Sequence, residues 1–367
     1  MFDRRLVMNF DWTLLVTTIL ISIIGVFNIY SSTYPHTGNG TPLFMKQIYW
    51  LLIGVGLATL ILLFDYRTFI RYAYPFLVFC TILLFLVILI GRTTSGSQRW
   101  LNLGFISFQP SELTKIALIL ALTRFFTENE NLQGYGLRDL GVPFFLLTIP
   151  MLLVFKQPDL GTVVLLSLIF VSVLAFMGLH RRTWFVLMAG CSAVVPFLWY
   201  LLKDYQKLRL MTFLNPDLDP LKTGYHITQS KIAVGSGTLF GKGFLKGTQS
   251  QLHFLPEQHT DFVFSVWAEE WGFVGSFVLL FLLLLLISRG LKIASISKER
   301  AGTTLAIGIS AMFFWQTFVN VGMVVGIVPV VGVPLPLVSY GGTSLITTLM
   351  GIGILTNISM RRFMLSR

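Results

Sequence analysis

Apolar runs of about 20 residues recur along most of this 367-residue chain. A helix needs roughly 20 predominantly apolar residues to cross the hydrocarbon core of a bilayer. The composition agrees, because 54% of the residues are hydrophobic, only 12% are charged, and the mean hydropathy is +0.77. No stretch shows the alternation of apolar and polar residues that a transmembrane barrel requires. The sequence therefore predicts an all-α, polytopic integral membrane protein.

Ten runs are long enough to be spans, and residues 1–367 are expected to form a single transmembrane domain. The spans are expected at Trp12–Ser31, Gln47–Phe64, Tyr72–Gly91, Pro110–Phe126, Leu140–Phe155, Leu160–Leu179, Trp184–Leu202, Phe262–Ser288, Leu305–Val328 and Leu345–Met360. The first run has no A-x-A-type cleavage site and is interpreted as a retained helix. Short polar turns are expected at 65–71 and 180–182, and a polar loop at 92–109.

Two connections stand out. Residues 203–261 form the one long loop, and its segment Tyr225–Val234 is compatible with a short amphipathic helix at the interface. Residues 329–342 are too rich in Pro and Gly for a plain helix. At membrane depth such backbone is tolerated only when it packs inside protein or lines a cavity.

The basic residues predict the orientation, because short cytoplasmic loops collect Lys and Arg. With the N-terminus inside, the inner short segments hold Arg4, Arg5, Arg67, Arg71, Arg124, Arg138, Arg181, Arg182, Arg289, Lys292, Lys298, Arg300, Arg361, Arg362 and Arg367. The outer short loops and span ends hold Lys46, Arg92, Arg99, Lys115 and Lys156. We therefore expect an N-in, C-in topology. The long loop between the seventh and eighth spans is then extracytoplasmic, on the same side as Arg99 and the stretch 329–342.

Several other functions find no support. The net charge of +11 lies in loops near lipid phosphates and is no evidence for nucleic-acid binding. Both cysteines, Cys80 and Cys191, lie inside apolar runs, which speaks against a disulfide or a thiolate metal site. His253 and His259 do not have zinc-site spacing. The glycines around residues 242–246 do not form a phosphate-binding loop pattern.

Four segments bring ionisable groups to the predicted outer boundary, where such groups are costly and commonly functional. They carry Arg99; Glu112 with Lys115; Asp159; and Glu257, His259 and Asp261. Glu112 and Lys115 are three residues apart, so they share a helix face and can pair. Either that ion pair only joins helices, or Lys115 faces an anionic head group or tunes a neighbouring carboxylate. Asp159 follows a proline at a helix start, where capping is the simpler alternative.

Asp261 lies where the long loop meets the eighth span. It is either a helix cap or a general base at a half-dehydrated boundary. Burial would raise the pKa of these carboxyl groups, and a nearby Arg99 or Lys115 would lower it. Glu269 and Glu270 lie further into the same span, and their partners are not evident from the sequence.

Five segments resemble the signatures of the SEDS family, whose members serve shape, elongation, division and sporulation. They are SQRWLNLG (97–104), FQPSELTK (108–115), KQPDLGT (156–162), LPEQHTDFVFSVWAEEWG (255–272) and PLPLVSYGGTS (334–344). The resemblance extends over essentially the whole chain. The modest length of the chain and its minimal tails are more similar to the elongation branch of the family than to the division branch.

The resemblance implies a peptidoglycan glycosyltransferase of the bacterial inner membrane with its site facing the exterior. Such an enzyme polymerises lipid II, a disaccharide–pentapeptide on undecaprenyl pyrophosphate, into β-1,4-linked glycan and releases undecaprenyl pyrophosphate. The implied partners are a class B penicillin-binding protein, which crosslinks the strands, and other elongation-complex proteins.

The resemblance also implies roles for residues. The essential aspartate of the family matches Asp261. The expected substrate-binding residues are Arg99, Trp100, Glu112, Lys115 and Asp159, with Glu257 and His259 beside Asp261. Arg99 and Lys115 are expected to hold pyrophosphate. No cofactor is assigned, and a divalent cation, Mg²⁺ or Mn²⁺, is the one that this chemistry would employ.

Two alternatives remain open at this stage. Broken helices are a transporter feature, so the chain could be a lipid II flippase, although no inverted repeat is evident. It could also be a non-catalytic scaffold for the penicillin-binding protein, in which case Asp261→Asn would be harmless.

Overall fold

The computed structural model describes residues 9–34, 41–94, 97–102, 107–131, 133–202, 204–215, 223–252, 254–255 and 257–362. The main helices are α2 (Trp12–Thr33), α3 (Leu43–Leu63), α5 (Ala73–Ile90), α6 (Pro110–Glu128), α7 (Gly141–Lys156), α8 (Leu160–Met177), α9 (Arg181–Leu201), α13 (Val263–Ile296), α14 (Arg300–Val325) and α15 (Gly342–Arg361). The shorter ones are α4 (Tyr66–Arg71), η1 (Arg138–Leu140), α10 (Asp204–Leu214), α11 (Thr223–Ser236) and α12 (Thr248–Gln251). The predicted all-α class is confirmed.

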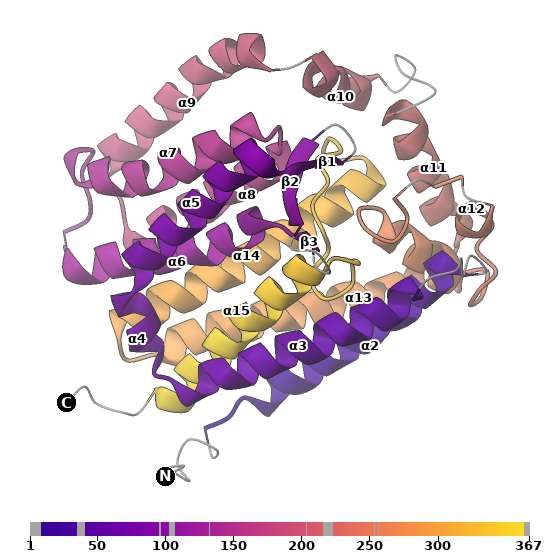
Figure 1. The fold of residues 1–367 in the computed structure, drawn as a ribbon, viewed down its shortest axis with the longest axis horizontal. Coiled ribbons are helices and arrows are strands. Elements are labelled where there is room, and N and C mark those ends of the chain that lie inside the picture. The colour runs from indigo at the N-terminus through magenta and orange to yellow at the C-terminus, as the bar shows by residue number, and fades with distance from the viewer. Residues whose placement is uncertain are drawn as a thin grey trace.

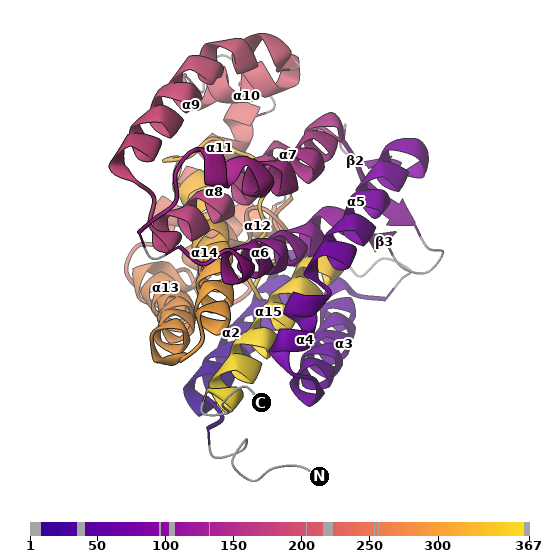
Figure 2. The same ribbon diagram turned by 90° about the vertical axis from the view of Figure 1, so that its left-hand side faces the viewer.

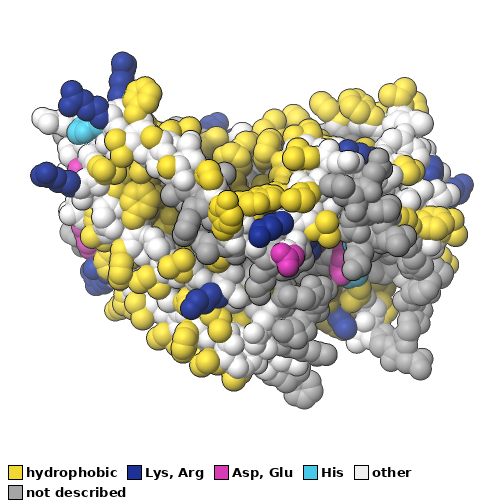
Figure 3. Space-filling model, turned by 90° about the horizontal axis from the view of Figure 1, so that it is seen from above, with side chains coloured by type: hydrophobic (Ala, Val, Ile, Leu, Met, Phe, Trp, Pro, Cys, Tyr) yellow, Lys and Arg dark blue, Asp and Glu magenta, His cyan; other side chains and the backbone are white. Residues whose placement is uncertain are grey.

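Eight of the described helices are long and apolar enough to cross a membrane, namely α2, α3, α5, α7 together with η1, α8, α13, α14 and α15. The helices α6 and α9 lie at two further predicted spans, so each of the ten runs forms a long helix. Several helices expose large apolar side chains, such as Ile90 at 74% and Phe145 at 64%. Figure 3 shows hydrophobic side chains over much of one face, with scattered charged groups. This surface is that of a multi-pass membrane protein.

The connections differ more from the prediction. The turn at 65–71 contains the short helix α4, because the side chain of Asp65 accepts a hydrogen bond from Arg67 N and caps it. The loop at 92–109 carries three short antiparallel strands in the order β1 (Arg92–Thr94), β2 (Ser97–Asn102) and β3 (Ser107–Phe108). Arg99 and Trp100 therefore lie on a strand that pairs on both edges. The predicted helix in the long loop is present as α11, packed on α13 and α14.

The helices are arranged around α15, which is largely buried and packs on α3, α6 and α14. Figure 1 shows α2, α3, α13, α14 and α15 running side by side, with the described parts of both chain ends at the same end of this bundle. In Figures 1 and 2, α9 and α10 lie apart at one edge. The site described below lies where α8, α13 and α15 begin and α14 ends.

The helix α13 is broken at Gly272, where φ is 65° and ψ is −158°. This conformation is essentially restricted to glycine. The break frees backbone groups, and the segment 238–243 satisfies them through four hydrogen bonds: Lys242 N to Glu269 O (3.0 Å), Gly243 N to Glu270 O (3.0 Å), Phe273 N to Thr238 O (2.9 Å) and Val274 N to Leu239 O (3.1 Å). The nine residues before the break therefore form a short helix that the long loop holds in place.

Two buried carboxylates reinforce this contact. The Glu269 carboxylate accepts hydrogen bonds from Lys242 Nζ (2.6 Å), Gln249 N (3.0 Å) and Thr248 Oγ1 (3.1 Å). The Glu270 carboxylate accepts one from the Ser31 hydroxyl. The partners that the sequence did not reveal are thus in the long loop and in α2, and these two residues join elements at the break.

The break in α13 predicts that substitution of Gly272 lowers the stability of the protein. A Cβ added at Gly272 would lie 2.7 Å from Leu239 O, in a conformation that other residues avoid. We expect Gly272→Ala to destabilise the protein by about 1–3 kcal/mol or more. Thermal unfolding in detergent measures this, with Gly56→Ala as the control, because a Cβ at Gly56 in α3 meets nothing within 4 Å. Equal melting temperatures for the two variants would contradict the described break.

Candidate active site

Hydrogen-bond donors from other segments of the chain hold the backbone of residues 259–261 in place. Three consecutive carbonyl groups each accept a hydrogen bond: His259 O from Tyr340 N (2.9 Å), Thr260 O from Ser339 Oγ (2.7 Å) and Asp261 O from Asn320 Nδ2 (3.0 Å). Two donors come from the irregular stretch 329–341 and one from α14. The prediction that this stretch packs inside protein and lines a cavity is confirmed.

A cavity of about 430 Å³ opens in front of Asp261, within the size range of small-molecule sites. Its walls come from α6, α8, α10, α11, β2, the segment 257–262 and the stretch 330–344. The lining residues are Arg99, Trp100, Gln109, Glu112, Thr162, Leu165, Arg209, His226, Glu257, Thr260, Asp261, Phe262, Val330, Val331, Gly332, Val333, Pro334, Tyr340, Gly341 and Ser344. Segments far apart in the sequence therefore meet at this carboxylate.

Asp261 is half-buried, and burial is the largest cause that raises the pKa of its carboxyl group, to about 6. The negative charge of Glu257 raises this pKa further, and the charges of Arg99 and Arg209 lower it. Its carboxylate has no hydrogen-bond donor among the residues that the structure describes. No side chain caps the start of α13, which Phe262 precedes, so the alternative of Asp261 as a helix cap is wrong.

Gly332 makes room for this carboxylate. Its φ is 71°, and a Cβ at this position would lie 3.2 Å from Asp261 Oδ2. Any larger residue would be strained in this backbone conformation and would press on the carboxylate.

Asp159 and Arg99 form a second element of the site. The Asp159 side chain is buried and caps α8, accepting hydrogen bonds from Thr162 N (3.2 Å) and Thr162 Oγ1 (2.9 Å). It also lies 3.6 Å from Arg99 Nη1, and Arg99 Nη2 donates to Pro158 O (3.3 Å). The capping alternative for Asp159 is therefore correct. In addition, the carboxylate orients Arg99, whose side chain reaches the cavity.

Glu112 and Lys115 form the predicted ion pair, with Lys115 Nζ 2.8 Å from Glu112 Oε2. Lys115 is fully buried, whereas Glu112 lines the cavity. The ammonium group thus lies behind the carboxylate, one turn deeper in α6. That Lys115 contacts substrate stays a prediction, and it requires the pair to open.

The histidine that lines the cavity is not the one that was predicted. His259 is half-buried beside the Tyr340 ring at 5.9 Å, it does not line the cavity, and burial lowers the pKa of its imidazole. His226 of α11 does line the cavity and meets the Phe262 ring edge-on at 6.2 Å. His253 lies outside the described residues, and within the described ranges no three His, Cys, Asp or Glu residues gather as a metal site.

Sequence reasoning missed Arg209, His226, Gln109, Tyr340 and Ser344. Arg209 and His226 lie in the long loop among other basic residues, with no spacing that distinguishes them. Of the missed residues, Gln109, Tyr340 and Ser344 fall inside quoted motifs, which is the one signal that pointed toward them.

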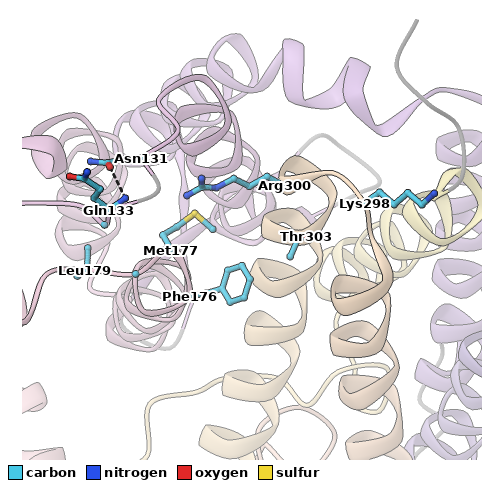
Figure 4. Close-up of a pocket in the computed structure, with 10 residues that line it drawn as sticks. Asn131, Gln133, Phe176, Met177, Leu179, Lys298, Arg300 and Thr303 are labelled. Carbon is cyan, nitrogen blue, oxygen red and sulfur yellow. Dashed lines mark hydrogen bonds between the residues drawn. The ribbon is translucent and has the colours of Figure 1, made fainter.

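A second cavity, of about 610 Å³, lies at the opposite end of α8 and α14 (Figure 4). Its main charged group, Arg300, contacts Glu130 at 2.7 Å and donates to the Tyr135 hydroxyl at 3.3 Å. Figure 4 shows Arg300 pointing toward Asn131 and Lys298 pointing away. Arg300 thus fastens the loop before α7 to α14, and none of the predicted site residues lies here.

The family model described as cell cycle protein, for FtsW, RodA and SpoVE, matches residues 11–363. The chain belongs to this family. It is 44% identical over 360 residues to the peptidoglycan glycosyltransferase MrdB of Escherichia coli strain K12, covering 98% of this chain and 96% of that protein. It is 36% identical to a probable peptidoglycan glycosyltransferase FtsW of Geobacter sulfurreducens, covering 96% of each. The resemblance seen in the five motifs is confirmed.

Solved members of the family have the same fold. The chain matches a structure reported as showing structural coordination of polymerization and crosslinking by a peptidoglycan synthase complex, with a TM-score of 0.82, 33% identity, and 97% and 99% of the two chains covered. It also matches the crystal structure of the rod shape determining protein RodA of Thermus thermophilus, with a TM-score of 0.71, 31% identity, and 96% and 98% covered.

The buried ion pair predicts a non-additive stability effect. Removing one partner leaves an uncompensated buried charge, so we expect Lys115→Met to cost about 3–5 kcal/mol of stability. The double variant Glu112→Leu with Lys115→Met should recover most of this loss, because it replaces both charges. Thermal unfolding of the four proteins in the cycle measures the coupling. A stable Lys115→Met variant that only lost substrate affinity would instead support direct contact with substrate.

Proposed function

We propose that this chain is a peptidoglycan glycosyltransferase that polymerises lipid II into β-1,4-linked glycan, in the elongation branch of its family. The observation that carries the proposal is the Asp261 carboxylate, without a hydrogen-bond donor among the described residues and facing a cavity lined by Arg99 and Arg209. Relatives over nearly the whole chain are named peptidoglycan glycosyltransferases. The higher identity to MrdB than to the FtsW relatives supports the elongation branch.

In this proposal Asp261 is the general base. The acceptor sugar's 4-hydroxyl oxygen forms the new bond to the donor's anomeric carbon, the bond to pyrophosphate breaks, and Asp261 takes the hydroxyl proton. A single displacement converts an α-linked donor into a β-linked product, so one base suffices and no covalent intermediate is needed, as in inverting glycosidases. A carboxyl group with a pKa of about 6 is ionised at neutral pH and more basic than an ordinary carboxylate.

The leaving group needs positive charge. Arg99 and Arg209 both line the cavity, and guanidinium groups bind phosphate oxygens with paired hydrogen bonds. Fixed charges aimed at a developing anion usually make the largest contribution to catalysis. We therefore assign pyrophosphate to these two arginines, with Trp100 as an apolar wall and Lys115 acting through Glu112.

A divalent cation would fit this donor set. Mg²⁺ is commonly held by one or two carboxylates together with substrate phosphates. Glu257 is a carboxylate on the cavity wall that could hold the cation, and pyrophosphate would supply further oxygens. A bound Mg²⁺ or Mn²⁺ would supply charge neutralisation for the departing pyrophosphate.

We also propose a location and partners for this chain. The cavity would face the exterior of the bacterial inner membrane, because the described basic short segments and the described parts of both chain ends lie at the other end of the bundle (Figure 1). A class B penicillin-binding protein would crosslink the product. The similarity to a chain of a peptidoglycan synthase complex, whose description joins polymerization and crosslinking, supports such a partner. Other elongation-complex proteins would bind as well.

The broken helix α13 favours one competing function, a lipid II flippase. Proteoliposomes separate the two. A polymerase converts labelled lipid II into glycan, whereas a flippase moves it across the bilayer without consuming it.

Removing the proposed base, Asp261, should abolish the reaction. Asp261→Asn should reduce lipid II polymerisation by the purified protein with its penicillin-binding partner to background, because the amide cannot accept the proton. Glycan gels measure it, and Asp139→Asn, at the exposed opposite end, serves as the control with normal product. A normal ladder from folded Asp261→Asn would mean that the base lies elsewhere, with Glu257 the next residue to test.

The second prediction concerns pH. The reaction needs ionised Asp261, so the rate should rise with pH through about 6 and then level off. Glu257 raises the pKa of Asp261, so Glu257→Gln should lower that pKa and move the acid limb of kcat/KM to lower pH. Glu128→Gln, at the other end of α6, is the matched control. An acid limb that stays in place or moves to higher pH would count against Asp261 as the base.

A further inference from the structure

Asn320 is a fully buried polar residue inside the apolar helix α14. Its Nδ2 donates to Asp261 O at 3.0 Å and to Val333 O at 2.7 Å. Both partners are carbonyl oxygens, so the NH₂ group must face them. The Oδ1 atom is buried and has no hydrogen-bond partner in the described part of the chain. An unsatisfied buried acceptor is unfavourable, so packing alone does not explain an asparagine here.

The two acceptors of Asn320 belong to facing parts of the cavity wall. One is the backbone of Asp261 itself. The other is Val333, next to Gly332, whose added Cβ would approach Asp261 Oδ2 to 3.2 Å. The side-chain amide of Asn320 therefore sets the distance between the backbone of Asp261 and the segment at Gly332 and Val333, which faces the Asp261 carboxylate.

Ser339 makes an equivalent bridge one residue earlier. Its hydroxyl donates to Thr260 O at 2.7 Å and accepts from Leu335 N at 2.8 Å. The segment before α13 is thus tied twice by side chains to the structure around it.

We propose that Asn320, assisted by Ser339, is a positioning residue for Asp261. It touches no reacting atom, and it acts by fixing the place and surroundings of the carboxylate. This inference rests on the proposed function, and it adds a residue that acts through Asp261. Loss of the bridge lets residues 259–261 relax, which admits water to the carboxylate and misplaces it relative to the acceptor hydroxyl. A misplacement of about 1 Å can cost about 100-fold in rate.

The chain offers a matched control in Asn357 of α15. This asparagine is also buried, and its Nδ2 donates to two carbonyl oxygens, Ile61 O (2.7 Å) and Phe64 O (2.6 Å). It lies near the inner end of α15, roughly 20 Å beyond the cavity at 1.5 Å per residue. Its Oδ1 also accepts from Tyr66 N (3.3 Å) and Arg361 Nε (3.0 Å). Asn357→Ala therefore removes a bridge between two carbonyl groups, and these two further bonds, away from Asp261.

The experiment compares wild type, Asn320→Ala, Asn357→Ala and Ser339→Ala, each full-length with the penicillin-binding partner and lipid II. Thermal unfolding, kcat, KM and the pH profile are measured. We expect both asparagine variants to lose thermal stability. Of these two, only Asn320→Ala should lower kcat, by about 10–100-fold, with KM within about twofold of wild type. Its acid limb should move to lower pH, because a better hydrated carboxyl group has a lower pKa.

Each outcome decides a different question. If Asn320→Ala and Asn357→Ala had the same kcat and the same pH profile, the positioning role would be overturned. It would also be overturned if Asn320→Ala changed KM and left kcat as in wild type. If Asn320→Ala does not fold, the pH profile of Ser339→Ala is the test. An acid limb of Ser339→Ala that is shifted from wild type supports the positioning role, and an unchanged acid limb contradicts it. A wild type that makes no glycan would instead count against the proposed function.

Discussion

The structure depends on one constraint, namely that backbone polar groups at membrane depth need partners within the protein. Two irregular places in the half of the bundle that contains the cavity meet this constraint. At Gly272 the long loop supplies donors and acceptors to the broken ends of α13. At residues 259–261 the carbonyl groups are satisfied by Asn320, Ser339 and Tyr340. The nine-residue helix between these places is thus held at both ends, so the carboxylate just before it has a defined position.

Hydrogen bonding distinguishes the structural carboxylates from the carboxylate of Asp261, the proposed base. Asp159 caps a helix and orients Arg99, Glu112 is paired with Lys115, and Glu269 is paired with Lys242. Asp261 alone among these has no donor in the described part of the chain, although it is half-buried. Such a group is costly to keep ionised, and its raised pKa reflects that cost. The proposed role as base draws on the same imbalance, so the electrostatic cost and the proposed chemistry have one origin.

Much of this could be predicted from the sequence, and the exceptions have physical reasons. Long apolar runs located the helices, and Pro and Gly marked the irregular stretch beside the cavity. Arg99, Trp100, Glu112, Glu257 and Asp261 line the cavity as expected. The break at Gly272 was not foreseen, because its surrounding residues suit a helix and its cause is a loop distant in sequence. Arg209 and His226 were missed because the loop's tertiary path, rather than any local pattern, brings them to Asp261.

The central claim is that Asp261 acts on bound substrate rather than holding it. Equilibrium binding of labelled lipid II to wild type and to Asp261→Asn, measured beside single-turnover glycan formation, tests this most directly. The account predicts dissociation constants within about twofold of each other, since Arg99 and Arg209 remain to hold pyrophosphate, and glycan from wild type only. Loss of lipid II binding in Asp261→Asn would contradict it and make Asp261 a substrate ligand.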